Sequence, residues 1–202
     1  MIITRNCHHA LKLQAGEIVV AVNPISKDSE FKSNKFGADI VLVSMNHPDF
    51  NGAEEATFGE KEPVTIMGPG EYEIKGIFVR GFGENSAYSG SSFINTTYYM
   101  QMDGMNVCYL GVLSGGKISS EASESIDEVD ILFVPLSKDL PVKDAYKLAV
   151  SLEPKLMIPL GDEKDILQFS KEAGQEKVEK LDKLTLKKKD LDGKAGEVVV
   201  IM

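Results

Sequence analysis

The sequence predicts an α+β fold in which two β-sheets pack face to face beneath outer helices. Short β-branched runs separated by Gly and Pro fill the first half of the chain. Helix and strand patterns alternate in the second half. The run Ile40 to Val43 is apolar throughout, as in a strand that is buried on both faces. Strands grouped early and helix–strand–helix units later fit stacked sheets covered by helices.

Early strands are expected over 1–4, 10–13 and 17–23, and the polar segments 27–37 and 51–61 are expected to be loops. Between these loops, the buried run ends at Ser44 to Asp49, where Pro48 cannot continue the hydrogen-bonded ladder. His47 and Asp49 therefore follow directly after a buried strand. Ligands of open α/β architectures bind at such strand ends.

A second group of strands follows in the middle of the chain. The triplet Gly68-Pro69-Gly70 suits a turn after a strand over 64–67, and the pattern over 71–81 predicts one strand with a bulge at Gly76. The Gly, Ser and Asn content of 83–92 predicts a mobile loop. Asp103-Gly104 predicts a tight hairpin turn between strands over 93–101 and 105–110.

The last third predicts helices and short buried strands. Pro141 suits the first helical position, and Asp162 and Gly174 suit the two ends of another helix. The alternating Leu pattern over 177–191 predicts an exposed strand. The expected elements are a short helix within 114–125, strands over 129–135, 155–159 and 198–201, and helices over 141–152 and 162–173.

The segment after the buried strand resembles the His-x-His-x-Asp-His motif of the metallo-β-lactamase superfamily. Met45 and Phe50 replace its first and last His, while His47 and Asp49 match the motif. The sequence Gly-Pro-Gly-Glu-Tyr-Glu-Ile-Lys-Gly at 68–76 resembles a block of the ascorbate-6-phosphate lactonase-like subgroup. The resemblance covers nearly the whole chain. It implies one domain over 1–202 with the four-layer αββα sandwich of this superfamily.

The resemblance also implies where metal ligands would stand. The first metal position matches Met45, His47 and Tyr109, and the second matches Asp49, Phe50, Val112 and Gly161. Each set therefore retains one residue of the ligand type. In the first hairpin, His8 matches the His of a family Gly-His pair, Cys7 replaces the Gly, and Asn23 replaces an Asp. A catalytic zinc needs three protein ligands and one open position, so we expect this end of the sandwich to be packed core without a cofactor.

Two functional hypotheses remain open at the level of sequence. The first is a non-catalytic module that binds a small molecule or a protein, with exposed strand edges available for self-association. The second is a hydrolase of an ester, lactone or phosphoester. His8, His47 and Asp49 could then form a rebuilt site for zinc, iron or manganese, because two His and one carboxylate make a known facial metal triad. His9, Tyr109 and Cys7 are further candidate ligands.

Composition limits the partners that we expect. The net charge is −9, with 43% hydrophobic and 26% charged residues, which disfavours nucleic acid and anionic membranes because both call for a basic face. No apolar run approaches the ~20 residues that span a bilayer, and the first residues do not resemble a signal peptide. Cys7 and Cys108 are expected to be buried free thiols, which suits a reducing cytoplasm.

Overall fold

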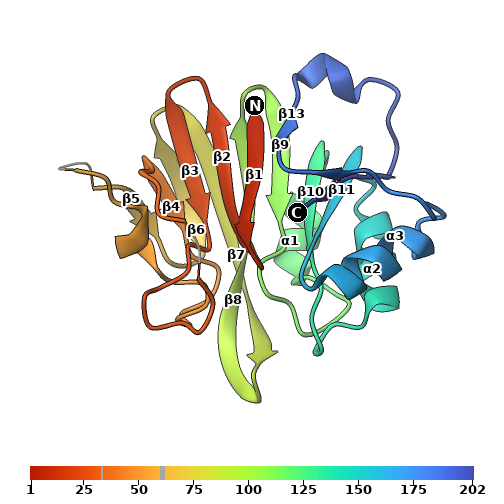
Figure 1. Cartoon of the computed structure of the whole chain (residues 1–202), viewed down its shortest axis with the longest axis horizontal. Coiled ribbons are helices and arrows are strands. Elements are labelled where there is room, and N and C mark those ends of the chain that lie inside the picture. Colours follow the sequence, from red (N-terminus) through yellow and green to blue (C-terminus); the bar gives the residue numbers. More distant parts are fainter. Residues whose placement is uncertain (33, 60–61) are drawn as a thin grey trace.

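The computed structural model describes residues 1–32, 34–59 and 62–202, which form two mixed β-sheets packed against each other (Figure 1). The six-stranded sheet has the order β13-β1-β2-β3-β4-β5. Its strands are β1 (Ile2–Cys7), β2 (Ala10–Ala15), β3 (Ile18–Val22), β4 (Ile40–Leu42), β5 (Val64–Ile66) and β13 (Leu184–Thr185). The predicted α+β sandwich is confirmed, and Glu60 and Lys61 of the predicted loop 51–61 lie outside the described residues.

The seven-stranded sheet has the order β14-β11-β10-β9-β8-β7-β6. Its strands are β6 (Gly70–Ile74), β7 (Ile77–Tyr88), β8 (Ser91–Met102), β9 (Met105–Tyr109), β10 (Ile131–Pro135), β11 (Leu156–Leu160) and β14 (Glu197–Val198). Asp103 and Gly104 join β8 to β9 with φ of 54° and 71°, so the hairpin turn predicted there is confirmed. A separate pair, β12 (Lys180–Leu181) and β15 (Val200–Ile201), lies near the C-terminus.

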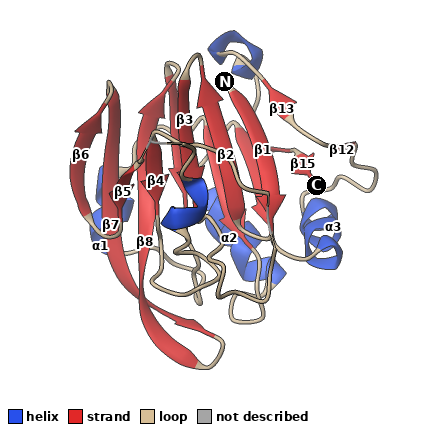
Figure 2. Ribbon diagram, turned by 60° about the vertical axis from the view of Figure 1, so that its left-hand side comes forward, coloured by secondary structure: helices blue, strands red, loops and turns tan. Residues whose placement is uncertain are grey.

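Apolar side chains of both sheets interdigitate in a core between them, and a second core lies beneath the helices. Helices α1 (Ser120–Ser125), α2 (Val142–Ser151) and α3 (Glu163–Glu172) cover the outer face of the seven-stranded sheet (Figure 2). The outer face of the six-stranded sheet packs against the 3-10 turn η1 (Ala53–Ala56) and neighbouring loop residues. None of the helices in these described ranges is long and apolar enough to cross a membrane.

Three local predictions were wrong. The segment 71–81 is not one bulged strand, because Lys75 and Gly76 have φ of 52° and 77° and turn the chain between β6 and β7. The segment 83–92 is not a loop: β7 and β8 pair as far as Tyr88 and Ser91. Backbone ladder bonds do not depend on side chains, so a Gly- and Ser-rich sequence can still form strands.

The segment 177–191 is not a single exposed strand. It holds the two-residue strands β12 and β13 and the 3-10 turn η2 (Lys188–Leu191). Leu186 and Leu191 are buried in the core between the sheets. The alternating leucines therefore pack into the core from separate short elements and not from one continuous strand.

Candidate functional site

The loop after β4 is fixed to the end of β3. Asn23 has φ of 47°, and its amide pairs with Ser44 twice: Ser44 N–H donates to Oδ1 at 2.8 Å, and Nδ2 donates to Ser44 Oγ at 2.8 Å. The Thr96 N–H of the facing sheet donates to the Ser44 carbonyl at 2.7 Å. These bonds hold the segment from Met45 to Phe50 at the open end of the sandwich.

His47 and Asp49 lie together on this loop. Asp49 N–H donates to His47 Nδ1 at 3.2 Å, and Asp49 Oδ2 lies 3.4 Å from the same nitrogen. Both carboxylate oxygens of Asp49 also accept hydroxyl hydrogen bonds, from Ser29 Oγ at 2.5 Å and from Tyr88 OH at 2.8 Å. Burial and the neighbouring Asp49 carboxylate raise the pKa of Tyr88, so its phenol stays a donor. Asp49 thus joins three segments of the chain.

Aromatic rings surround His47. The ring centroids of Tyr88, Phe93 and Phe50 lie 4.9, 5.7 and 5.9 Å from the His47 ring. Phe50 also lies edge-on to His9 at 5.9 Å, so its ring contacts both imidazoles. Beneath them, one buried apolar cluster consists of Met45, Phe50 and Val112, with Tyr88 and Phe93 packed against it.

Tyr109 is buried at the floor of this region. Its hydroxyl accepts from Asn23 Nδ2 at 2.7 Å and donates to the His9 carbonyl at 3.3 Å. Burial raises the pKa of this phenol, which therefore stays neutral. The hydroxyl is thus engaged in a buried hydrogen-bond network that links β9 to the turn after β1.

Two glycines at this end leave no room for a side chain. Gly161 has φ of 150°, and a Cβ there would lie 2.6 Å from the Leu136 carbonyl oxygen. Gly111 has φ of 76°, and a Cβ there would lie 2.1 Å from Asn95 Oδ1, which accepts from Val112 N–H at 2.7 Å. A His in place of Gly161 would therefore require the backbone to move.

His8 and His9 follow β1 with their rings 4.7 Å apart. His8 adopts φ of 48°, a conformation that costs energy for any residue except Gly. His9 is 1% exposed. Within the described part of the chain, His8 Nδ1 and both His9 ring nitrogens have no hydrogen-bond partner. Burial lowers the pKa of both imidazoles, of His9 strongly.

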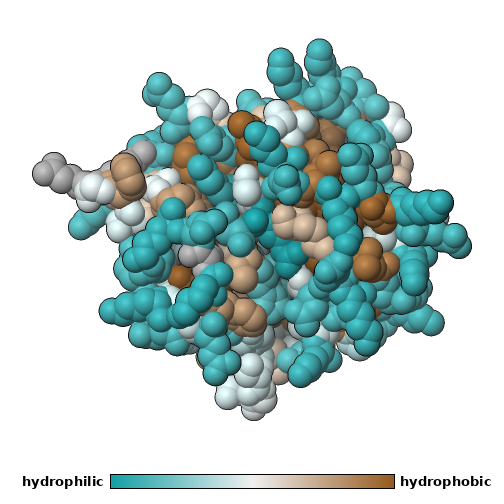
Figure 3. Space-filling model, viewed as in Figure 1, coloured by the Kyte–Doolittle hydropathy of each residue, from teal (hydrophilic) through white to brown (hydrophobic). Residues whose placement is uncertain are grey.

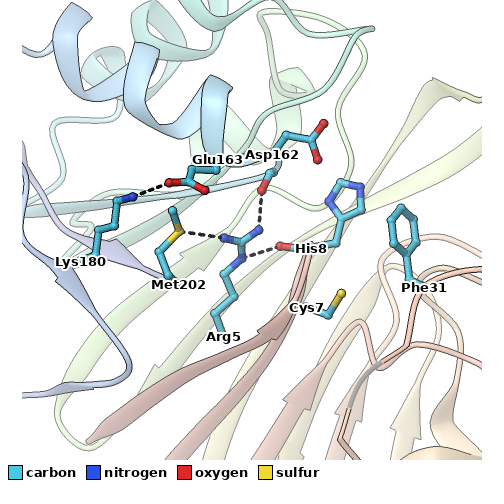
Figure 4. Close-up of a pocket in the computed structure, with 9 residues that line it drawn as sticks. Arg5, Cys7, His8, Phe31, Asp162, Glu163, Lys180 and Met202 are labelled. Carbon is cyan, nitrogen blue, oxygen red and sulfur yellow. Dashed lines mark hydrogen bonds and ion pairs between the residues drawn. The ribbon is translucent and has the colours of Figure 1, made fainter.

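A cavity of about 400 Å³ opens beside His8, with Arg5, Phe31 and Asp162 on its walls (Figure 4). Gly161, at the turn between β11 and α3, also lines it. Cys7 lies half-buried at its edge, so the prediction of two buried thiols is correct for Cys108 alone. Burial raises the pKa of Cys108 to about 12, which keeps that thiol protonated.

The structure thus brings most of the candidate residues to one end of the sandwich, in two groups. The first group consists of His47, Asp49, Met45, Phe50 and Val112. The second group, His8 and Gly161, lines the cavity. Across residues 1–32, 34–59 and 62–202, no three His, Cys, Asp or Glu side chains are grouped in a way that could hold a metal ion. Sequence reasoning missed Ser29, Tyr88 and Arg5, whose positions follow from long-range packing.

A family model for the β-lactamase superfamily domain matches residues 3–161. The chain belongs to the metallo-β-lactamase superfamily. A Thermotoga maritima structure described as a candidate Zn-dependent hydrolase of this superfamily superposes with a TM-score of 0.74 at 23% identity, covering 99% of this chain and 97% of that one. No curated protein matches the chain.

Two further superfamily structures show the same fold. Igni18, a metallo-hydrolase of the archaeon Ignicoccus hospitalis, superposes with a TM-score of 0.62 at 15% identity over 92% of this chain and 99% of its own. CmlA, a diiron β-hydroxylase of Streptomyces venezuelae, superposes with a TM-score of 0.58 at 12% identity over 98% of this chain and 52% of its own. The fold therefore occurs with metal-dependent enzymes, while these identities support similarity of fold alone.

Proposed function

We propose that this superfamily member is a non-catalytic binding or assembly module. The observation that carries the proposal is the buried cluster of Met45, Phe50 and Val112, which fills the space beside His47 and Asp49. Apolar side chains at these positions supply no metal ligands. Each predicted metal position keeps a single candidate, His47 or Asp49.

The residues present do not fit a dinuclear metal centre. Tyr109 already shares its hydroxyl with Asn23 and the His9 carbonyl, and Gly161 cannot carry a side chain without a clash. Asp49 accepts hydroxyls from Ser29 and Tyr88. A bound metal would have to displace these donors, and a zinc site also needs three protein ligands. The degenerate motif thus agrees with a structural role for Asp49.

The proposal also covers the subgroup, the cellular setting and the class of partner. The sequence at 68–76, which resembles a block of the ascorbate-6-phosphate lactonase-like subgroup, supports kinship with that subgroup. The two free thiols agree with a cytoplasmic setting. The face seen in Figure 3 is mainly hydrophilic, and the chain carries a net charge of −9, which favours a small molecule or a protein as partner over nucleic acid or membrane. Exposed strands β5 and β6 end the two sheets and offer edges for self-association.

The second candidate is a hydrolase with one rebuilt metal site of His8, His47 and Asp49. It is favoured by Nδ1 of His8, which has no hydrogen-bond partner among the described residues, and by burial, which lowers the pKa of His8 and keeps its ring neutral. The metal would be zinc, iron or manganese, and the substrate an ester, lactone or phosphoester. For this site to form, Asp49 would have to exchange the Ser29 and Tyr88 hydroxyls for the metal.

Elemental analysis of untagged protein, purified without chelator, separates the two candidates. The module predicts no stoichiometric metal and no hydrolysis of model esters, lactones or phosphoesters. About one equivalent of zinc, iron or manganese, lost together with turnover in His47→Ala but retained in the exposed control Glu124→Gln, would establish the hydrolase instead.

A further inference from the structure

The cavity beside His8 has two unlike charges on its walls that do not form an ion pair with each other. Among the described residues, Arg5 has no carboxylate within ion-pair distance. The Asp162 side chain likewise makes no ion pair and no capping hydrogen bond with any described residue. The nearby Lys180 and Glu163 already pair with each other. Arg5 and Asp162 are thus the charges left to meet a ligand (Figure 4).

The Arg5 guanidinium is held in place from several sides. Nε donates to the His8 carbonyl at 2.9 Å, Nη2 donates to the Gly161 carbonyl, and Nη1 reaches the Ile201 carbonyl at 3.5 Å and Met202 Sδ at 3.8 Å. These contacts engage four N–H groups, and a guanidinium has five donors. Its hydrogen-bond acceptors are neutral, and Asp162 acts on its charge without forming an ion pair with it. The one N–H group that remains, together with the positive charge, suits one oxygen of a carboxylate.

The remaining walls supply shape and a further polar atom. His8 holds a costly left-handed conformation and packs edge-on against Phe31 at 4.6 Å, and its Nδ1 has no partner within the described ranges. Strained residues that the surrounding structure holds in place are common at ligand sites. The volume of about 400 Å³ falls in the range of small-molecule pockets.

We propose that this cavity binds a small zwitterion of the α-amino-acid class, with the ligand carboxylate on Arg5 and its ammonium group on Asp162. A simple anion would meet the Asp162 and Glu163 carboxylates, and a simple cation would meet Arg5. A ligand that carries both charges satisfies both walls, and its side chain faces His8 and Phe31. This inference names a ligand class for the proposed binding module and rests on that function.

The test measures the binding of a panel of free L-α-amino acids to the full chain, by calorimetry and by the shift in thermal unfolding. Acetate and methylammonium at the same concentrations serve as probes of one charge each. At a hundredfold excess over Kd, an amino acid should raise Tm by about 5 to 10 °C. The single-charge probes should raise it far less.

Substitutions locate the site. Asp162→Asn should weaken amino-acid binding by at least about tenfold, since it removes the ammonium partner. Asp165→Asn, in the first turn of the same helix but outside the cavity walls, should leave Kd unchanged. Arg5→Lys should also weaken binding because a lysine ammonium lacks the rigid planar donors that hold the guanidinium in place. Asp162→Asn remains informative if Arg5 proves necessary for folding.

The proposal is overturned if none of the amino acids in the panel binds at millimolar concentration. It is also overturned if acetate binds equally well, or if Asp162→Asn leaves the Kd for amino acids unchanged. Such failures would leave the non-catalytic module standing, because that function is tested separately by metal content at His47 and Asp49. Stoichiometric metal lost in His47→Ala would instead remove the non-catalytic function itself.

Discussion

At the scale of single residues, Asp49 acts as a tie between segments far apart in the sequence. Its oxygens accept from Ser29 in the loop after β3 and from Tyr88 at the tip of the β7–β8 hairpin. Hydrogen bonds to a charged acceptor contribute about 1.5–3 kcal/mol each when they are partly shielded from water. These bonds give Asp49 a structural role between the two segments.

Asp49→Asn should lower the free energy of unfolding by about 1–3 kcal/mol, because the amide weakens both hydroxyl bonds. Urea unfolding measures the loss. In a double-mutant cycle, Tyr88→Phe should cost much less in the Asp49→Asn background than in the natural chain. Additive effects of the two substitutions, or a loss no larger than in the exposed control Glu124→Gln, would contradict the role given to Asp49.

His9 makes folding sensitive to acid. Burial lowers its pKa well below the ordinary 6.5, so the unfolded chain binds a proton that the folded chain refuses. Stability due to His9 is therefore full above pH 6.5 and falls as the pH drops toward the lowered pKa, by at most about 1.4 kcal/mol per pH unit. His8 contributes in the same direction, since burial lowers its pKa as well.

Replacing His9 with Leu removes this titration and two buried ring nitrogens that no described residue pairs with. Urea unfolding between pH 7.5 and pH 5 should therefore show a shallower loss of stability in His9→Leu than in the natural chain. Lys117→Gln, which changes an exposed charge far from β1, serves as the control. An identical pH slope in His9→Leu would show that His9 is already partnered or protonated in the folded state.

At the scale of elements, the turn after β9 depends on Gly111. Asn95 of β8 accepts the Val112 N–H, and its side chain occupies the space where a Cβ of residue 111 would lie. Positive φ alone costs a non-Gly residue roughly 1–2 kcal/mol. At Gly111 a steric clash adds to that cost.

Gly111→Ala should therefore destabilise the protein by about 2–4 kcal/mol, more than backbone strain alone explains. The matched control is Gly193→Ala, which has φ of 75° and open space around the added Cβ. Thermal or urea unfolding compares the two variants. Equal losses would mean that the Asn95 contact has no steric consequence.

Much of the element pattern could be predicted from local sequence. Ile40 to Leu42 forms the expected buried strand, Asp103-Gly104 forms the expected turn, and α3 begins after Asp162 as expected. The prediction of a loop over 83–92 was wrong because a high Gly and Ser content does not by itself prevent strand formation. Ser and Gly over 83–92 form strands because β7 and β8 pair along their whole length.

The candidate site was predictable only in part. His47, Asp49, Met45, Phe50 and Val112 meet at one end of the sandwich, as the motif positions imply. Local sequence carries no signal that Tyr88 would reach Asp49, since 39 residues separate them. The cavity of Arg5 and Asp162 joins β1 to the start of α3, which become neighbours through the packing of the two sheets and not through the sequence.

At the scale of the whole molecule, the superfamily fold carries a packed apolar cluster at one end of the sandwich. The two sheets, their shared core and the helices over the seven-stranded sheet are those of the superfamily. At the strand ends, Met45, Phe50 and Val112 pack together, and Asp49 accepts hydroxyl hydrogen bonds from Ser29 and Tyr88. A small cavity remains beside this packed region, where His8, Arg5 and Asp162 meet.

The most direct test of this account is a calorimetric titration of zinc into untagged, chelator-stripped protein at neutral pH. The packed cluster and the engaged Asp49 predict no stoichiometric binding in the submicromolar range. Asp49→Asn and His47→Ala should give the same flat titration as the natural chain. One equivalent of zinc bound tightly to the natural chain, and lost in both variants, would contradict the account.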